Sequence, residues 1–107
     1  MTAVTSEIPA LIAEVGIVPV VVLDDGGRAR DLAEALRAGG VGCAEFTLRT
    51  PAGLAAIAAA ADVDGFLAGA GTVLTLAQAD AAVDAGARFA VTPGYDPVVA
   101  DRLRAGG

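Results

Sequence analysis

The amino-acid sequence predicts an α/β fold, in which an N-terminal helix precedes four strand–helix units of a parallel sheet. Short apolar runs rich in β-branched residues alternate with alanine-rich stretches of helical length, and glycine or proline stands between them. The run at residues 17–23 contains no polar residue, and continuous apolar strands are typical of parallel sheets that are buried on both faces. A helix followed by four strand–helix units is the order expected of a parallel sheet with helical crossovers.

Length and composition limit the classes of protein to consider. The chain has 107 residues, the size of one small domain. Its net charge is −6, with seven arginines, no lysine and no histidine, so nucleic acid is not an expected partner and imidazole chemistry is excluded. Cys43 is the only cysteine and is expected to be a buried strand residue. Neither a signal peptide nor a bilayer-spanning run is found, so we expect a cytoplasmic protein, without membrane, metal or cofactor.

Local start and stop signals define the predicted elements. The first helix takes Ser6 as its N-cap and ends at Gly16. The Thr-Pro pair at residues 50–51 and the Asp-Pro pair at residues 96–97 are each expected to open a helix, because the first residue caps it and proline suits its first turn. The expected helices cover residues 6–15, 29–38, 52–61, 76–85 and 97–105. The expected strands cover residues 17–23, 41–49, 65–73 and 87–93.

The fourth helix has a start signal of its own, since Thr75 and Gln78 have the spacing of a capping box.

The end of the second helix, LRAGG at residues 36–40, recurs at residues 103–107, where a further strand would follow by analogy. We therefore expect residues 1–107 to form a single partial barrel domain of four βα units. This is about half of a (β/α)8 barrel, which needs about 200 residues or more.

A polar face interrupts the second predicted strand. Because side chains alternate along a strand, Glu45, Thr47 and Arg49 share one face, opposite Phe46 and Leu48. In a barrel the polar set would point into the interior, with Arg49 nearest the carboxyl end of the strand, where barrel enzymes have their sites. An ion pair between Glu45 and Arg49 on a solvated edge strand explains the same pattern, and this alternative stays open.

Two further segments follow strands at the same end of the predicted sheet. Residues 69–75, GAGTVLT, let a ligand approach the backbone, and Thr72 offers a hydroxyl and an N–H to a carboxylate. Residues 91–96, VTPGYD, leave the fourth strand. Each segment alone is equally typical of a turn, and the glycines lack the spacing of a dinucleotide-binding motif or a Walker motif.

Taken together, these segments resemble the 2-keto-3-deoxy-6-phosphogluconate aldolase family, also called 4-hydroxy-2-oxoglutarate aldolase. The resemblance runs over residues 5–107 and is carried by VPVVV, EFTLRTPAG, GAGTVLT and AQADAAVDAGARFAVTPG. It implies a (β/α)8 TIM barrel with an extra N-terminal helix, usually assembled as a homotrimer.

The resemblance also implies class I aldol cleavage without a cofactor. A lysine amine forms an iminium with the ketone of pyruvate or of the larger keto acid, and a glutamate shuttles protons. Glu45 matches the family's glutamate, and Arg49 matches the arginine that holds the keto-acid carboxylate. Thr72 matches a threonine that helps to bind that carboxylate, and Pro93 matches a proline that lines the pocket. A small keto acid is the expected partner, in a homo-oligomer.

One departure from the family concerns the nucleophile. The family's Schiff-base lysine lies in the sixth strand, beyond residue 107, and this sequence contains no lysine. We therefore expect an aldolase-family chain that is inactive by itself, and whether its substrate is phosphorylated stays open. An alternative is a catalytically inert half-barrel that assembles through the edges of its first and fourth strands. A phosphate-binding barrel isomerase is less favoured, since it gives no reason for the E-x-T-x-R-T pattern.

Overall fold

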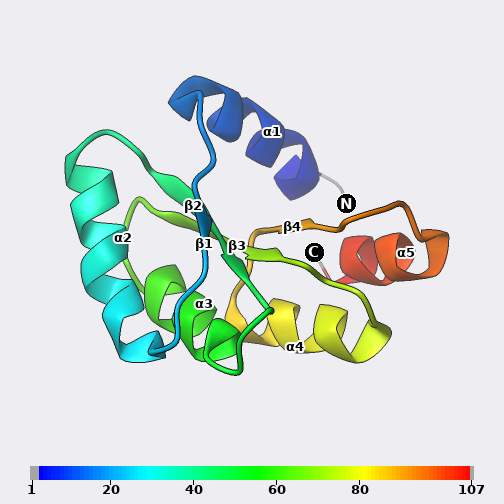
Figure 1. Ribbon diagram of the computed structural model, residues 1–107. Coiled ribbons are helices and arrows are strands. Elements are labelled where there is room, and N and C mark those ends of the chain that lie inside the picture. The colour runs from blue at the N-terminus through cyan, green and yellow to red at the C-terminus, as the bar shows by residue number, and fades with distance from the viewer. Residues whose placement is uncertain (1–2, 107) are drawn as a thin grey trace.

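The computed structural model of the protein describes residues 3–106, with side-chain burial described from Ile8 onward. These residues form a four-stranded parallel sheet of order β1-β2-β3-β4, with helices between the strands (Figure 1). The strands are β1 (Val20–Val21), β2 (Cys43–Thr47), β3 (Leu67–Gly71) and β4 (Phe89–Val91). The helices are α1 (Ala3–Val15), the 3₁₀ helix η1 (Gly26–Arg28), α2 (Ala29–Ala38), α3 (Gly53–Ala61), α4 (Leu76–Ala85) and α5 (Pro97–Ala105). The predicted α/β fold class is confirmed.

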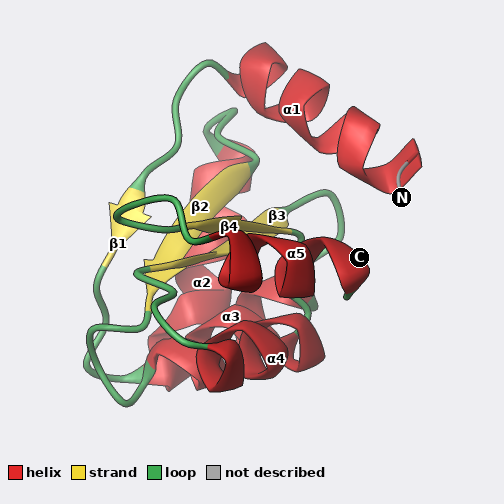
Figure 2. Cartoon of the chain, turned by 90° about the vertical axis from the view of Figure 1, so that its right-hand side faces the viewer, coloured by secondary structure: helices red, strands yellow, loops and turns green. Residues whose placement is uncertain are grey.

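The hydrophobic core lies between the sheet and a layer formed by α2, α3 and α4. Figure 2 shows these three helices together on one side of the sheet. Phe46 and Ile57 are the largest fully buried side chains, and most other buried positions of the core are alanines. These alanines are Ala29, Ala33, Ala44, Ala56, Ala60, Ala68, Ala70, Ala79 and Ala82. Because alanine is narrow, the helices can approach the sheet closely, and the core is filled with few large side chains.

The two terminal helices lie outside this layer. Figure 1 shows α1 apart from the other helices, and its residues Leu11 and Val15 line a hollow of about 470 Å³ with Gly42 and Leu67, at the amino ends of β2 and β3. Helix α5 packs beside α4 and places Val99 in the core. Within residues 3–106, no helix is both long enough and apolar enough to cross a bilayer.

Strand β1 is shorter and more exposed than the sequence predicts. Its ladder with β2 is limited to Val20 and Val21, although the Pro19 carbonyl also accepts a hydrogen bond from the N–H of Glu45 at 2.9 Å. Val20 is 58% exposed and Val22 is 49% exposed. The prediction that this strand is buried on both faces is wrong, because β1 is an edge strand and the helical layer covers only the other face of the sheet. The other three strands lie within their predicted ranges.

Two predicted N-caps are wrong. Helix α1 begins at Ala3, so Ser6 lies within the helix and does not cap it. Helix α3 begins after Ala52, and the hydroxyl of Thr50 donates a hydrogen bond to the carbonyl of Leu23 instead. Thr50 therefore connects the turn after β2 to the segment after β1, at the carboxyl ends of both strands.

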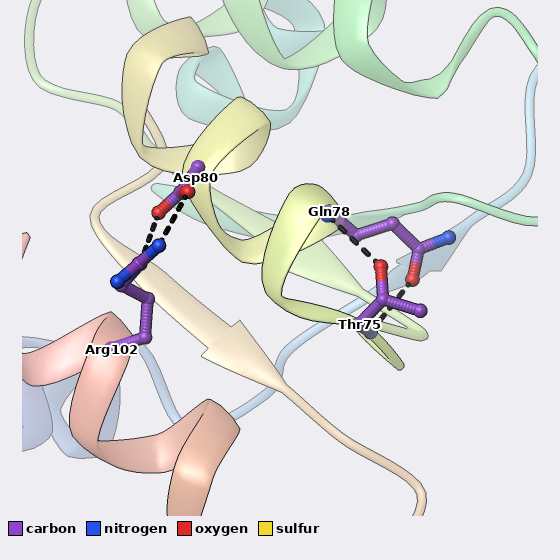
Figure 3. A network of polar contacts seen from close by, with 4 residues as sticks. All are labelled: Thr75, Gln78, Asp80 and Arg102. Carbon is purple, nitrogen blue, oxygen red and sulfur yellow. Dashed lines mark hydrogen bonds and ion pairs between the residues drawn. The ribbon is translucent and has the colours of Figure 1, made fainter.

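The predicted start of α4 and its stop are both confirmed. The Thr75 hydroxyl accepts a hydrogen bond from the N–H of Gln78 at 3.1 Å, and the Gln78 side chain accepts one from the N–H of Thr75 at 3.3 Å (Figure 3). Gly86 ends the helix in the left-handed region, with φ of 103°. In the same figure Arg102 of α5 donates hydrogen bonds to both carboxylate oxygens of Asp80 on α4, at 2.7 and 3.2 Å. Local capping thus defines where α4 begins and ends, and one exposed ion pair connects it to α5.

Candidate active site

Strand β2 carries the candidate site in the interior of the sheet, between β1 and β3. Phe46 points into the helix-covered core, so its neighbours Glu45 and Thr47 lie on the opposite face of the sheet. Both polar side chains are buried, Glu45 with 8% and Thr47 with 1% of its surface exposed. The prediction that Glu45 and Thr47 share one face of a strand is confirmed.

The carboxyl group of Glu45 lies over Gly71 of the neighbouring strand β3. A β-carbon built on Gly71 would stand only 2.6 Å from Cγ and 2.7 Å from Cδ of Glu45, and closer still to Oε2. Strand register pairs Thr47 with Gly71 and Glu45 with Gly69. The side chain of Glu45 therefore leans toward the carboxyl end of the sheet and fills the space that a side chain at position 71 would need.

Burial changes the acidity of Glu45. Loss of hydration raises the pKa of its carboxyl above the ordinary value of 4.5, and the positive charge of Arg49 opposes this by favouring the ionised form. Within residues 8–106 the structure contains no ion pair between Glu45 and Arg49. The carboxyl is thus influenced by the guanidinium at a distance and is not neutralised by direct contact with it.

Arg49 lies in a different place from the one predicted. Strand β2 ends at Thr47, and Arg49 belongs to the exposed turn that follows, so it does not continue the polar face of the strand. The alternative of an ion pair on a solvated edge strand is also wrong, because β2 is paired on both sides and Glu45 is buried. A side chain on a turn at the carboxyl end of a sheet can reach a ligand from the rim.

Thr72 is the one residue other than glycine with a positive φ, 60°, in the part of the chain that the structure describes. It follows β3 directly and is partly buried. A β-branched residue in the left-handed region is strained, at a cost of about 1–3 kcal/mol, and such strain is concentrated at functional sites. The sequence placed Thr72 at the carboxyl end of a strand but gave no sign of this conformation.

Pro93 follows β4 in an exposed loop that the hydroxyl of Thr92 supports by donating a hydrogen bond to the carbonyl of Gly94 at 2.7 Å. Pro93 lines a hollow of about 270 Å³ together with Leu74, which lies shortly after Thr72 in the chain. Glu45 and Arg49 do not line that hollow. The structure thus brings Glu45 and Thr47 together, with Arg49 and Thr72 at the ends of their strands, and leaves Pro93 in a separate hollow.

The comparison with known proteins gives the identity of the fold. The family model described as KDPG and KHG aldolase matches residues 8–106. The chain belongs to the KDPG and KHG aldolase family. The 2-dehydro-3-deoxy-phosphogluconate aldolase of Zymomonas mobilis is 47% identical to it over 78 residues, which are 73% of this chain and 38% of the relative.

Solved aldolase structures support the same assignment. The 2-keto-3-deoxy-6-phosphogluconate aldolase of Zymomonas mobilis with 3-phosphoglycerate superposes with a TM-score of 0.84 at 39% identity, over 92% of this chain and 47% of that one. KDPG aldolase from Legionella pneumophila, with pyruvate captured as a covalent carbinolamine intermediate, gives a TM-score of 0.77 at 41% identity, over 87% and 46%. The chain thus spans less than half the length of these aldolases, and its four βα units correspond to about half of their barrel.

Two features of this candidate site were not predicted from the sequence. The hydroxyl oxygen of Thr47 is buried and has no hydrogen-bond partner in the structure. The ring of Phe89 lies over Gly69, since a β-carbon there would stand 2.6 Å from Cδ2 of the ring and closer to two other ring atoms. The alternating glycines 69 and 71 in β3 were the available signal, because glycine within a strand often marks the close approach of another group.

Cys43 plays no part in this arrangement. It is fully buried in β2, as predicted, and its thiol donates a weak hydrogen bond to the carbonyl of Ile17 at 3.4 Å. Burial raises the pKa of the Cys43 thiol. The protonated thiol therefore behaves as a small hydrophobic residue that joins β2 to the segment before β1.

Proposed function

We propose that this chain provides the keto-acid-binding and proton-transferring residues of a class I aldolase. The substrate class is a 2-keto-3-deoxy sugar acid, with or without phosphate, or 4-hydroxy-2-oxoglutarate, and the products are pyruvate and an aldehyde. The observation that carries the proposal is the buried carboxyl of Glu45, held over a glycine on the face of β2 that no helical layer covers. Burying a carboxyl group costs free energy, and a purely structural role does not require that cost.

Glu45 is proposed to accept and return one proton. Once an amine has formed an iminium with the keto group, the carboxylate accepts the proton of the substrate's C4 hydroxyl. The C3–C4 bond breaks, its electron pair moves to the iminium nitrogen, and an aldehyde and an enamine result. The proton is then delivered to C3 of the enamine, and hydrolysis of the new iminium releases pyruvate. Burial, which raises the pKa of Glu45, favours a group that can both accept and return this proton.

Arg49, Thr72 and Pro93 are proposed to bind the keto acid. The exposed guanidinium of Arg49 stands on the turn after β2, free to form two parallel hydrogen bonds with a carboxylate. Thr72 would add its hydroxyl and N–H to the same carboxylate from the end of β3, and Pro93 would line the pocket after β4. The Legionella structure, in which pyruvate is bound, supports this class of ligand.

The amine is proposed to come from a residue outside these 107 positions. The sequence has no lysine, the residue type whose amine forms the iminium in the family that it resembles. The family resemblance also predicts a homotrimer in the cytoplasm, and both remain predictions. The second candidate, an inert assembly half-barrel, is favoured by one observation, the exposed valines of the edge strand β1.

Binding of pyruvate to the 107-residue chain tests the proposal. Chemical-shift changes on addition of pyruvate should map to the residues after β2 and β3. Arg49→Ala should weaken the affinity about tenfold or more, because it removes a charged hydrogen-bond donor. Arg37→Ala on the helical layer is the matched control and should leave the affinity unchanged. Equal binding by both variants, or none by the parent chain, would favour the assembly half-barrel.

Borohydride trapping tests where the amine lies. With pyruvate and borohydride, the 107-residue chain should gain no reduced pyruvate adduct on any internal residue, because an arginine side chain cannot take the place of a lysine amine. Mass spectrometry of peptides locates any adduct. An adduct on an internal residue would show that the chain supplies its own nucleophile and would contradict this part of the proposal.

A further inference from the structure

The backbone conformation at position 71 does not require a glycine, but the space above this position does. Four described glycines have a positive φ: Gly16, Gly40, Gly65 and Gly86. Gly71 does not, and it lies within the regular ladder between β2 and β4. Any side chain at this position would overlap Glu45, since a β-carbon would stand within 2.7 Å of three atoms of that side chain. The absence of a side chain at position 71 is therefore what lets the Glu45 carboxyl lie where it does.

Thr47 lies in the same row of the sheet. It is paired with Gly71 across the β2–β3 ladder, and neighbouring strands are about 4.8 Å apart. The Glu45 carboxyl, over Gly71, therefore lies within reach of the Thr47 side chain. The Thr47 hydroxyl is buried and has no hydrogen-bond partner among the described residues, although buried hydroxyls in folded proteins nearly always have one.

We propose that Gly71 and Thr47 are positioning residues for Glu45, Gly71 by leaving room for the carboxyl group and Thr47 by donating a hydrogen bond to it when it is ionised. This inference deepens the proposed function, because it concerns how the proton-transferring group is held. Neither residue needs to touch the substrate for the effect to occur.

The surroundings of Glu45 leave few other groups that could act on its charge. In its row of the sheet the neighbours are Val20 on β1, Gly69 on β3 and Phe89 on β4, and none of them titrates. Cys43 lies on the same face of β2, two residues before Glu45. Its buried thiol stays protonated, because burial raises its pKa. Arg49 is the charged residue that acts on Glu45, and it does so from an exposed turn without direct contact. The Thr47 hydroxyl, on the same face of β2, would add a hydrogen-bond donor that stabilises the ionised carboxylate.

Titration of Glu45 by NMR tests the inference on the 107-residue chain. The protein is labelled with ¹³C at the glutamate carboxyl groups, and the signal of Glu45 is assigned by its absence in Glu45→Gln. Thr47→Val, which preserves volume and removes the donor, should raise the pKa of Glu45 relative to the parent chain. Thr47→Ser, which keeps a hydroxyl, should restore it. Equal pKa values in the Val and Ser variants would overturn the role of Thr47.

Gly71→Ala tests the other half of the inference. Its methyl group should push the carboxyl away from β3 toward the open face, so the pKa of Glu45 should fall toward the ordinary range. Gly39→Ala is the matched control, because a β-carbon there would lie at an ordinary 3.6 Å from its nearest neighbours at the end of α2. A pKa in Gly71→Ala equal to that of the parent would overturn the role of Gly71. If that variant does not fold, the two Thr47 variants still decide the role of Thr47.

These measurements need neither substrate nor turnover. A parent chain that binds no pyruvate would remove the proposed function but leave the Glu45 titration intact. Conversely, unchanged titrations in a chain that binds pyruvate through Arg49 would remove this inference alone.

Discussion

The two faces of the sheet use small residues for opposite purposes. On the helix-covered face, alanines such as Ala68 and Ala70 let α3 approach β3 closely and are fully buried among apolar atoms. On the other face of the same strand, Gly69 and Gly71 make room for the side chains of Phe89 and Glu45 from the neighbouring strands. The helical face therefore supplies stability, whereas the open face is arranged around a buried acid.

The same contrast separates the central and edge strands. Residues 43–47 of β2 are all buried, because β1 and β3 flank this strand and helices pack on it. Val20 of β1 and Val22, which follows the strand, are both about half exposed. Variants on the two faces and at the strand and helix ends test this contrast.

Phe46→Ala should have the largest effect, because it removes the largest fully buried side chain of the helix-covered face. We expect the free energy of unfolding to fall by about 3–5 kcal/mol. Urea denaturation at a fixed protein concentration measures the change. Val20→Ala on the open face is the control and should change stability far less, since Val20 is mostly exposed. Similar losses in both variants would contradict the assignment of stability to the helical face.

Self-association of the isolated chain should be the next largest effect. The exposed apolar residues of β1 and the unpaired edges of β1 and β4 favour pairing with another copy. Sedimentation should show oligomers that increase with concentration, and Val22→Glu should reduce them. Val98→Glu is the matched control, because Val98 is 62% exposed but lies on α5. A monomer whose unfolding is sharp and independent of concentration would contradict this prediction.

Thr75→Ala should destabilise the chain by about 1 kcal/mol, through loss of the capping box at the start of α4. The effect is small because it is confined to one helix end at the surface. Thermal unfolding of Thr75→Ala and Thr75→Ser measures it, and the serine variant, which keeps the hydroxyl, should remain close to the parent. If serine is as destabilising as alanine, the hydrogen bond in Figure 3 does not stabilise the helix.

The smallest effect should come from Glu45 and be confined to a range of pH. Since burial raises its folded-state pKa, the stability due to protonated Glu45 is fully present below pH 4.5 and is lost as pH rises through the raised folded value. Glu45→Gln does not ionise, so its stability relative to the parent should increase across that range. Unfolding free energies at several pH values measure this, with Glu34→Gln on exposed α2 to account for the loss of one negative charge. If the difference in unfolding free energy between Glu45→Gln and the parent does not change with pH, the prediction that burial disfavours the ionised form of Glu45 is wrong.

Elements with strong local signals were predicted correctly from sequence. Helix α5 and the capping box of α4 depend on side chains that hydrogen-bond within three residues, so their signals are readable without a fold. The N-cap prediction for Thr50 failed because residues 51 and 52 continue the turn, so that α3 begins only after Ala52. The prediction for β1 failed because burial depends on which layers cover a strand, and an apolar run does not encode them.

Alternation and motif spacing are local properties, so they predicted the α/β order, the shared strand face of Glu45 and Thr47, and the resemblance to an aldolase family. The position of β2 inside the sheet, the place of Arg49 on a turn and the strained backbone of Thr72 depend on the folded chain. The position of Glu45 over Gly71, beside an unpartnered hydroxyl, depends on it as well. Strand register places Glu45 beside Gly69, from where its side chain reaches over Gly71, and register arises from the packing of the whole sheet.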